Sequence, residues 1–419
     1  MTNQIYTGDC FEKLPALDEN SVHAIVTDPP YGLAFMGRSW DDFEPKEYQA
    51  WCEKWATECL RVLKPGGHLL AFSGNRTHHR LMSGIEDAGY EIRDTITWHY
   101  GSGFPKALDV SKSIDKQADA DREVVETVRK THISTSNTND GWSRPSHKNK
   151  DGEAKKTMDI TQPATEQAEQ WDGFKSALKP ATEFVCVARS PLAEDTIAEN
   201  VVAHGTGALN IDATRIETDG ENLSYGSREI GDGVKYQTQP EPDNGGEQHT
   251  KGRYPSNVVF DAQQADVLDD DVGECETGDY AGRHATGSSM FLDESDNPDM
   301  SNGAYSDDKS GPSRYFYTSK ASKAERTLDG KIDNAHPTVK PIDLMEWLVQ
   351  LATAEEQIVL DPFAGSGTTC KAAKNKTRQF IGIEQQAKWA DVARVRSGLP
   401  PDDHSHIRSD DEQHGLEQF

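Results

Sequence analysis

The chain has no long hydrophobic run and no regular cysteine pattern. No apolar stretch of its 419 residues reaches the length of a membrane span, and the N-terminus lacks the charged and then apolar pattern of a signal peptide. The six cysteines are scattered, with no Cys-x-x-Cys pair and no histidines at zinc-binding spacing. These absences predict a soluble cytoplasmic protein that has no membrane contact, no disulfide framework and no metal site.

Positive charge is also scarce. The chain has 44 Lys and Arg residues against 71 Asp and Glu residues, which gives a net charge of -27 at pH 7. Such acidity ordinarily argues against a nucleic-acid partner, because phosphate binding depends on Lys and Arg. The acidic residues are spread along the whole chain, however, which is typical of a solubility adaptation to a very salty cytoplasm. The composition therefore predicts a halophilic protein and does not exclude DNA.

Segments of regular pattern alternate with irregular ones. The predicted boundaries are 1–105, 106–170, 171–192, 193–330, 331–396 and 397–419. The first, third and fifth segments read as strands and helices, and the strand of the third should pair antiparallel with the strand before the second. The second has almost no apolar periodicity and is expected to be a mobile polar insert. The fourth is polar and glycine-rich, and the last is an acidic tail.

An acid, two prolines and a tyrosine follow a short apolar run. VHAIV, residues 22–26, reads as a buried strand that proline ends, so Asp28 lies just past the carboxyl end of that strand. Ligands of open α/β sheets bind at such ends. Asp-Pro alone is a common turn. The full stretch TDPPYG is far rarer, and it makes Asp28, Pro29, Pro30 and Tyr31 candidate site residues.

A second candidate site is the small-residue turn in QIVLDPFAGSGTT, residues 357–369. Its glycines let a ligand approach the backbone, and the helix that follows presents free amide groups. A phosphate loop would need a lysine in this turn, and a dinucleotide fold would need a third glycine where Cys370 stands. The turn instead suits a cofactor with an adenosyl group, and Glu384, which ends the next strand, is placed to bind ribose hydroxyls.

Together these motifs resemble the amino-group DNA methyltransferases that use S-adenosyl-L-methionine, and the order of DPPY before DPFAGSGTT is similar to their beta class. Four further stretches resemble the same family: TWHYGSGFPK, ALKPATEFVCVARSPL, SKASKAER and AHPTVKP. The resemblance implies an α/β, Rossmann-like methyltransferase fold with a mostly parallel seven-stranded sheet, one antiparallel strand and a circularly permuted motif order. It makes 193–330 an irregular target-recognition region and places the strand before DPPY beside the strand before the glycine turn.

The resemblance also implies residue roles. The implied catalytic residues are Asp28, Pro29, Pro30 and Tyr31. The implied cofactor-binding residues are Asp9, Thr338, Lys340, Asp361, Phe363, Gly365, Gly367, Thr368 and Glu384. Phe363 would pack on the cofactor adenine, Asp9 would lie near its amino group, and Glu384 would bind its ribose. Thr338 and Lys340 would lie by its methionine end.

The expected chemistry concerns an exocyclic amino group, which is a poor nucleophile because its lone pair is delocalised into the ring. The Asp28 carboxylate and the Pro29 carbonyl would each accept one amino hydrogen, while Tyr31 would stack on a base flipped out of the duplex. Asp in the first position of DPPY, in place of Ser, favours adenine N6 as the target. The alternatives are cytosine N4, a base in RNA, and a catalytically idle DNA-binding scaffold.

Double-stranded DNA is the expected partner. Arg215, Arg253 and Arg314 are candidate contacts to phosphate or bases, although each alone is more typical of a solvated surface arginine. A separate cognate endonuclease is a conceivable partner, and the sequence leaves open whether the protein is a monomer or a homodimer.

Overall fold

The computed structural model describes residues 2–33, 41, 43–101, 107–129, 157–217, 252–273, 312–319, 327 and 339–403 of the chain. The chain forms two compact units, the first made of Met1–Gly101 with Thr182–Phe419 and the second of Ser102–Ala181. None of the helices in the described residues combines the length and the apolar character needed to cross a membrane. Thr338, predicted to lie by the cofactor, falls outside the described residues.

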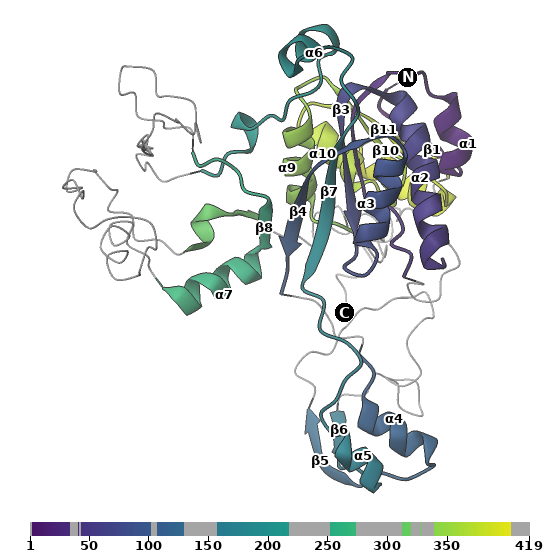
Figure 1. Cartoon of the computed structure of the whole chain (residues 1–419), viewed down its shortest axis with the longest axis vertical. Coiled ribbons are helices and arrows are strands. Elements are labelled where there is room, and N and C mark those ends of the chain that lie inside the picture. The colour runs from purple at the N-terminus through teal and green to yellow at the C-terminus, as the bar shows by residue number, and fades with distance from the viewer. Residues whose placement is uncertain are drawn as a thin grey trace, which may run out of the picture. The chain divides into compact units, whose positions relative to one another are not determined.

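The first unit is built on one nine-stranded sheet. Its strands, in spatial order, are β1 (Gln4–Thr7), β11 (Gln379–Glu384), β10 (Ile358–Asp361), β2 (Val22–Thr27), β3 (Leu63–Ser73), β7 (Thr182–Arg189), β4 (Glu91–His99), β8 (Val258–Asp261) and β9 (Tyr317–Ser319). Only β7 is antiparallel to its neighbours, β3 and β4, which lie on either side of it in Figure 1. The predicted seven-stranded sheet with its antiparallel strand is therefore confirmed, and it corresponds to the part of this order from β1 to β4. The strands β8 and β9, from the region expected to be irregular, extend the sheet beyond β4.

The sheet also confirms the permuted order. β2, the strand before DPPY, pairs in parallel with β10, the strand before the glycine turn, through Val359 opposite Ala24 and Leu360 opposite Ile25. On one side of this pair the sheet continues through β11 and β1, and on the other side it continues through β3. The β2–β10 pair is thus the switch point of the sheet, where open α/β sheets bind their ligands.

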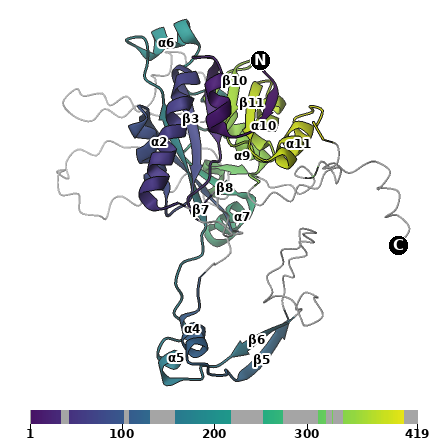
Figure 2. The same cartoon turned by 90° about the vertical axis from the view of Figure 1, so that its right-hand side faces the viewer.

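Helices cover both faces of the sheet. One group is α1 (Cys10–Lys13), α2 (Pro45–Val62) and α3 (His78–Asp87), and the other is α9 (Ile342–Ala352), α10 (Thr368–Asn375) and α11 (Ala387–Arg396). Figure 2 shows α2 on one side of the strands and α11 on the other. Successive strand residues face opposite layers: Ile25 packs with the first group, and its neighbours Ala24 and Val26 pack with the second.

The described part of the region 193–330 contains α6 (Ile197–His204), β8, α7 (Ala262–Val272) and β9. Two of the arginines proposed to contact DNA lie here in unexpected surroundings. Arg253 is 8% exposed, and the Arg215 guanidinium donates to Asp212 at 2.9 Å. Neither is the solvated surface side chain that is typical of an isolated arginine.

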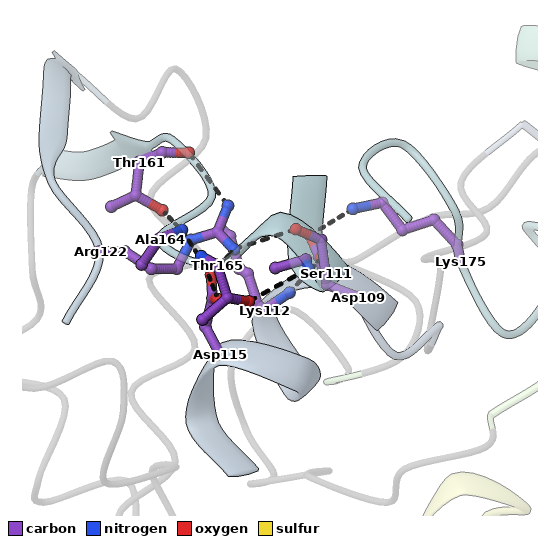
Figure 3. Close-up of polar contacts among 10 residues, drawn as sticks. Asp109, Ser111, Lys112, Asp115, Arg122, Thr161, Ala164, Thr165 and Lys175 are labelled. Atoms are coloured by element: carbon purple, nitrogen blue, oxygen red, sulfur yellow. Dashed lines mark hydrogen bonds and ion pairs between the residues drawn. The ribbon is translucent and has the colours of Figure 1, made fainter. Parts of the chain in front are cut away.

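The second unit contains α4 (Val110–Gln117), β5 (Val124–Arg129), β6 (Thr157–Thr161) and α5 (Glu166–Gln170), with β5 and β6 antiparallel. These four elements lie in the segment for which the sequence predicted little regular structure. A polar network joins them (Figure 3): Asp115 accepts hydrogen bonds from the Thr165 hydroxyl at 2.8 Å and from the amides of Ala164 and Thr165, and pairs with Arg122 at 2.6 Å. Such a network leaves no apolar periodicity for a sequence pattern to detect.

Candidate functional site

Two predicted acids lie together at the switch point. Asp28 follows β2 and Asp361 ends β10, so both lie at the carboxyl ends of paired parallel strands. The Thr27 hydroxyl donates to Asp361 Oδ1 at 2.6 Å and ties the two strand ends together. A small cavity is lined by both motifs, by the segment before α9 and by α9 itself: Asp28, Val339, Lys340, Met345, Asp361, Phe363, Ala364, Gly365, Ser366, Thr368 and Thr369.

The Asp28 carboxylate is engaged at both oxygens. Lys340 Nζ donates to Oδ2 at 2.6 Å, and the Tyr31 hydroxyl lies 2.8 Å from Oδ1. Burial raises the pKa of Asp28, although the Lys340 ammonium opposes this rise. Burial alone would lower the pKa of Lys340, but the nearby carboxylates of Asp28 and Glu183 raise it. Lys340, predicted at the methionine end of the cofactor, therefore also contacts the predicted catalytic acid as a charged ammonium.

The DPPY loop is fixed from behind by side chains that the sequence reasoning missed. Tyr48 of α2 donates its hydroxyl to the Pro30 carbonyl at 2.8 Å, and Asp41 accepts from the Gly32 amide at 2.7 Å. Gly32 has φ +64°, and a Cβ there would lie 2.7 Å from the Tyr48 ring. A buried tyrosine hydroxyl usually has a hydrogen-bond partner. Tyr48 therefore indicates that such a partner exists, but the sequence does not identify it as the Pro30 carbonyl.

The glycine turn connects β10 to α10 through two residues with positive φ. Gly365 has φ +52° and Gly367 has φ +80°, a region that side chains rarely adopt. At Gly367 a Cβ would lie 2.6 Å from Ala393 Cβ. Arg396, also missed by the sequence reasoning, donates to the Ser366 carbonyl at 2.8 Å and to the Thr368 hydroxyl at 3.0 Å. The turn is therefore held from α11, and its glycines are required by the backbone itself.

Glu384 lies beside this turn, and its role in binding ribose stays a prediction. Its two carboxylate oxygens accept from the amides of Gly365 at 2.9 Å and Gln386 at 2.8 Å. Burial raises the pKa of Glu384 to about 7, and burial likewise raises the pKa of Asp361 to about 6. Both carboxyls titrate close to neutral pH, which is common where a protein binds a ligand through buried acids.

Asp9 and Phe363 complete the predicted set. Asp9 caps α1 by accepting from the Phe11 amide at 2.8 Å, and its other oxygen lies 3.3 Å from Gln385 Nε2, next to Glu384. The Phe363 ring packs against Trp51, with 5.4 Å between ring centroids. Of the predicted site residues described in the structure, Asp28, Lys340, Asp361, Phe363, Gly365 and Thr368 line one cavity. Glu384 contacts the turn that forms its wall, and Gly367 is part of that turn.

A profile of the N6/N4 DNA methylase family matches residues 22–394. The chain belongs to this family. The resemblance seen in the motifs is thereby confirmed, and so is the methyltransferase fold expected from it. S-adenosyl-L-methionine is the cofactor that membership of this methylase family supports.

Individual relatives match this methylase over different lengths. Type II methyltransferase M.HindIII of Haemophilus influenzae is 24% identical over 436 residues, covering 95% of this chain and 96% of that protein. Type II methyltransferase M.HpaI of Haemophilus parainfluenzae is 32% identical over 117 residues, which are 27% of this chain and 37% of that protein. Among solved structures, the cytosine-N4-specific PvuII DNA methyltransferase aligns with a TM-score of 0.42 at 15% identity, covering 94% of this chain and 85% of its own.

The residues of this methylase fit its cofactor in chemical kind. The walls of the cavity include the Phe363 ring, which suits an adenine ring, and the amides at the start of α10, which suit a carboxylate. The partly buried carboxyl of Asp28 and the buried carboxyl of Asp361 suit hydroxyl or ammonium groups. Lys340 lines the cavity and reaches Asp28.

Proposed function

We propose that this DNA methylase transfers a methyl group to the N6 amino group of adenine at a specific site in double-stranded DNA. The observation that carries the proposal is the meeting of Asp28 with the glycine turn in one cavity at the β2–β10 switch point. An acceptor for amino hydrogens and a binding turn for the methyl donor are thus within one site. The Asp in the first position of DPPY, in place of Ser, supports adenine as the target.

The chain's own residues account for the activation of the amino group. The Asp28 carboxylate would accept one amino hydrogen and the Pro29 carbonyl the other, which directs the nitrogen lone pair away from the ring. The prolines contribute acceptors and no backbone donors, and Tyr48 holds the Pro30 carbonyl. Bound S-adenosyl-L-methionine supplies an electrophilic methyl group. The target base must leave the duplex to reach Asp28, at a cost of a few kcal/mol.

The test is methylation of DNA by the purified protein, followed by mass spectrometry of the nucleosides. We expect N6-methyladenine from the wild type and none from Asp28→Ala, because Asp28 is the acceptor that the amino group of the base requires. Formation of N4-methylcytosine would overturn the choice of base. Methylation of RNA alone, or retained turnover in Asp28→Ala, would overturn the proposed chemistry.

A further inference from the structure

Glu183 is a carboxylate of the site to which the sequence assigned no role, although it lies within the stretch ALKPATEFVCVARSPL that resembles the family. It lies next to the first residue of β7, opposite Trp98 of β4, because the antiparallel register brings the start of β7 to the edge where β2 ends. Its Oε2 lies 3.0 Å from the Tyr31 hydroxyl and 3.3 Å from Lys340 Nζ. The side chain is 21% exposed. Glu183 thus contacts the same two groups that contact Asp28.

The resulting cluster holds two carboxylates and one ammonium. Lys340 Nζ lies between Asp28, at 2.6 Å, and Glu183, at 3.3 Å, and its side chain is 8% exposed. Such a buried ammonium needs an anion wherever it moves, because an unpaired charge out of water is strongly unfavourable. The Tyr31 hydroxyl also has both carboxylates within reach, although it has one hydrogen to donate.

The contacts of Asp28 conflict with its proposed task. To accept an amino hydrogen, an oxygen of Asp28 must turn its electron pair to the base, yet Oδ2 is held by an ammonium at 2.6 Å and Oδ1 by a hydroxyl at 2.8 Å. An ammonium this close draws electron density from the carboxylate and weakens it as an acceptor. Each carboxylate oxygen has a second lone pair, but moving Lys340 and Tyr31 to another acceptor restores the full acceptor strength of Asp28, and Glu183 is within reach of both.

We propose that Glu183 is a positioning residue for methyl transfer, which takes over the Lys340 ammonium and the Tyr31 hydroxyl when the amino group of the base binds Asp28. This inference rests on the proposed function. It explains why the cluster carries a second carboxylate, whose charge would otherwise be unfavourable beside Asp28. It also balances charge: the sulfonium of the cofactor brings a second cation to a pocket that already holds Lys340, and two carboxylates then neutralise two cations.

The decisive variant is Glu183→Gln, which keeps the shape and an acceptor oxygen but removes the charge. We expect kcat to fall by up to about 100-fold, because Lys340 then remains on Asp28 and the base is misplaced. In a Lys340→Met background, which has no ammonium to transfer, the same Glu183→Gln change should alter kcat less than twofold. Glu183→Asp, which restores the charge, should recover part of the lost rate.

A binding measurement separates this inference from catalysis. Calorimetry of Glu183→Gln should show affinity for S-adenosyl-L-methionine lowered severalfold more than affinity for S-adenosyl-L-homocysteine, since the second ligand lacks the sulfonium charge. A purely structural role would weaken both ligands equally. The matched control is Glu91→Gln, which removes a carboxylate paired with Arg189 at 2.6 Å in the same β4–β7 pair and should leave both affinities and kcat unchanged.

The outcomes distinguish the two proposals. An active wild type with unchanged kcat in Glu183→Gln, equal loss for the two ligands, or an undiminished effect in the Lys340→Met background would overturn the role of Glu183 and leave the methylase function intact. No adenine or cytosine methylation by the wild type would overturn the proposed function, and this inference with it.

Discussion

Thr27 and Asp361 are 334 positions apart in the sequence, and the Thr27 hydroxyl donates to Asp361 Oδ1 at 2.6 Å. The bond crosses the β2–β10 switch point and joins the strand that carries Asp28 to the strand that carries the glycine turn. It also favours the ionised form of Asp361, since hydrogen bonds from Thr27 and Thr369 partly offset the rise in pKa that burial causes. The threonine therefore adds a side-chain link to the backbone pairing that joins the two halves of the site.

Thr27→Val should lower the free energy of unfolding by about 1–3 kcal/mol, the usual cost of leaving a buried acceptor without its donor. Urea unfolding at pH 8, where Asp361 is ionised, measures it. Thr57→Val is the matched control, because it removes an exposed hydroxyl bonded to Glu53 within α2 and should change stability by less than about 0.5 kcal/mol. If both variants lose the same free energy of unfolding, the bond across the switch point contributes no more to stability than an exposed hydrogen bond.

Gly365→Val should abolish binding of S-adenosyl-L-methionine while the sheet stays folded. Gly365 has φ +52°, its amide is held by Glu384 at 2.9 Å and it lines the cavity, so a branched side chain strains the turn at the cavity wall. Calorimetry and circular dichroism together test this. The control is Gly173→Val, which has a comparable φ of +82° in the second unit with no heavy atom within 4 Å of its Cβ position. Normal affinity in Gly365→Val would move the cofactor elsewhere.

Glu384 should give cofactor binding a pH dependence centred near neutrality. Burial raises its pKa to about 7, so the carboxylate that accepts ribose hydroxyls forms only as the pH rises through that value. Affinity for S-adenosyl-L-methionine should therefore strengthen from pH 6 to pH 8, and Glu384→Gln should remove the dependence. The exposed Glu355→Gln serves as control and should keep it. A wild-type affinity that is constant over this range would exclude Glu384 as the ribose ligand.

The same carboxyl should affect stability in the opposite direction. Its folded pKa of about 7 lies above the ordinary value of 4.5, so between these values the folded protein holds a proton that the unfolded chain has released. This group's contribution to stability is therefore fully present at lower pH and is lost as the pH rises through about 7. In thermal melts, the melting temperature of Glu384→Gln should therefore rise relative to that of the wild type as the pH is raised from 5 to 8.

The sequence predicted the parts of the site that lie at strand ends. Asp28 and Asp361 follow apolar runs, and parallel strands bring such ends to one edge, so their meeting followed from pattern and resemblance. Glu183 could not be found in this way. Its stretch indicates a strand, but its contact with Tyr31 depends on the register of β7 against its neighbours. Tyr48 is similar, because a helix pattern does not place Pro30 beside its hydroxyl.

Recognition of the DNA sequence is predicted to reside in residues 193–330. The described part places β8 and β9 on the edge of the sheet beyond β4, while Arg253 is buried and Arg215 is paired, so base contacts should come from other side chains of this region. Exchanging the whole segment for that of a type II relative should change the methylated sequence, read by sequencing that detects modified bases. An unchanged methylated sequence would place recognition in another segment.

Activity is expected to be highest well above ordinary cytoplasmic salt. With a net charge of -27 the chain repels itself and DNA at low ionic strength, and salt near 1 M shortens the screening length to about 3 Å. Salt also weakens contacts to phosphate, so the two trends oppose each other and give a broad optimum. Folding should set its lower limit, because self-repulsion acts even without DNA. Circular dichroism and methyl transfer measured across one potassium chloride series test this, and a protein fully folded and most active near 0.1 M, where the screening length is about 10 Å, would contradict the halophilic interpretation.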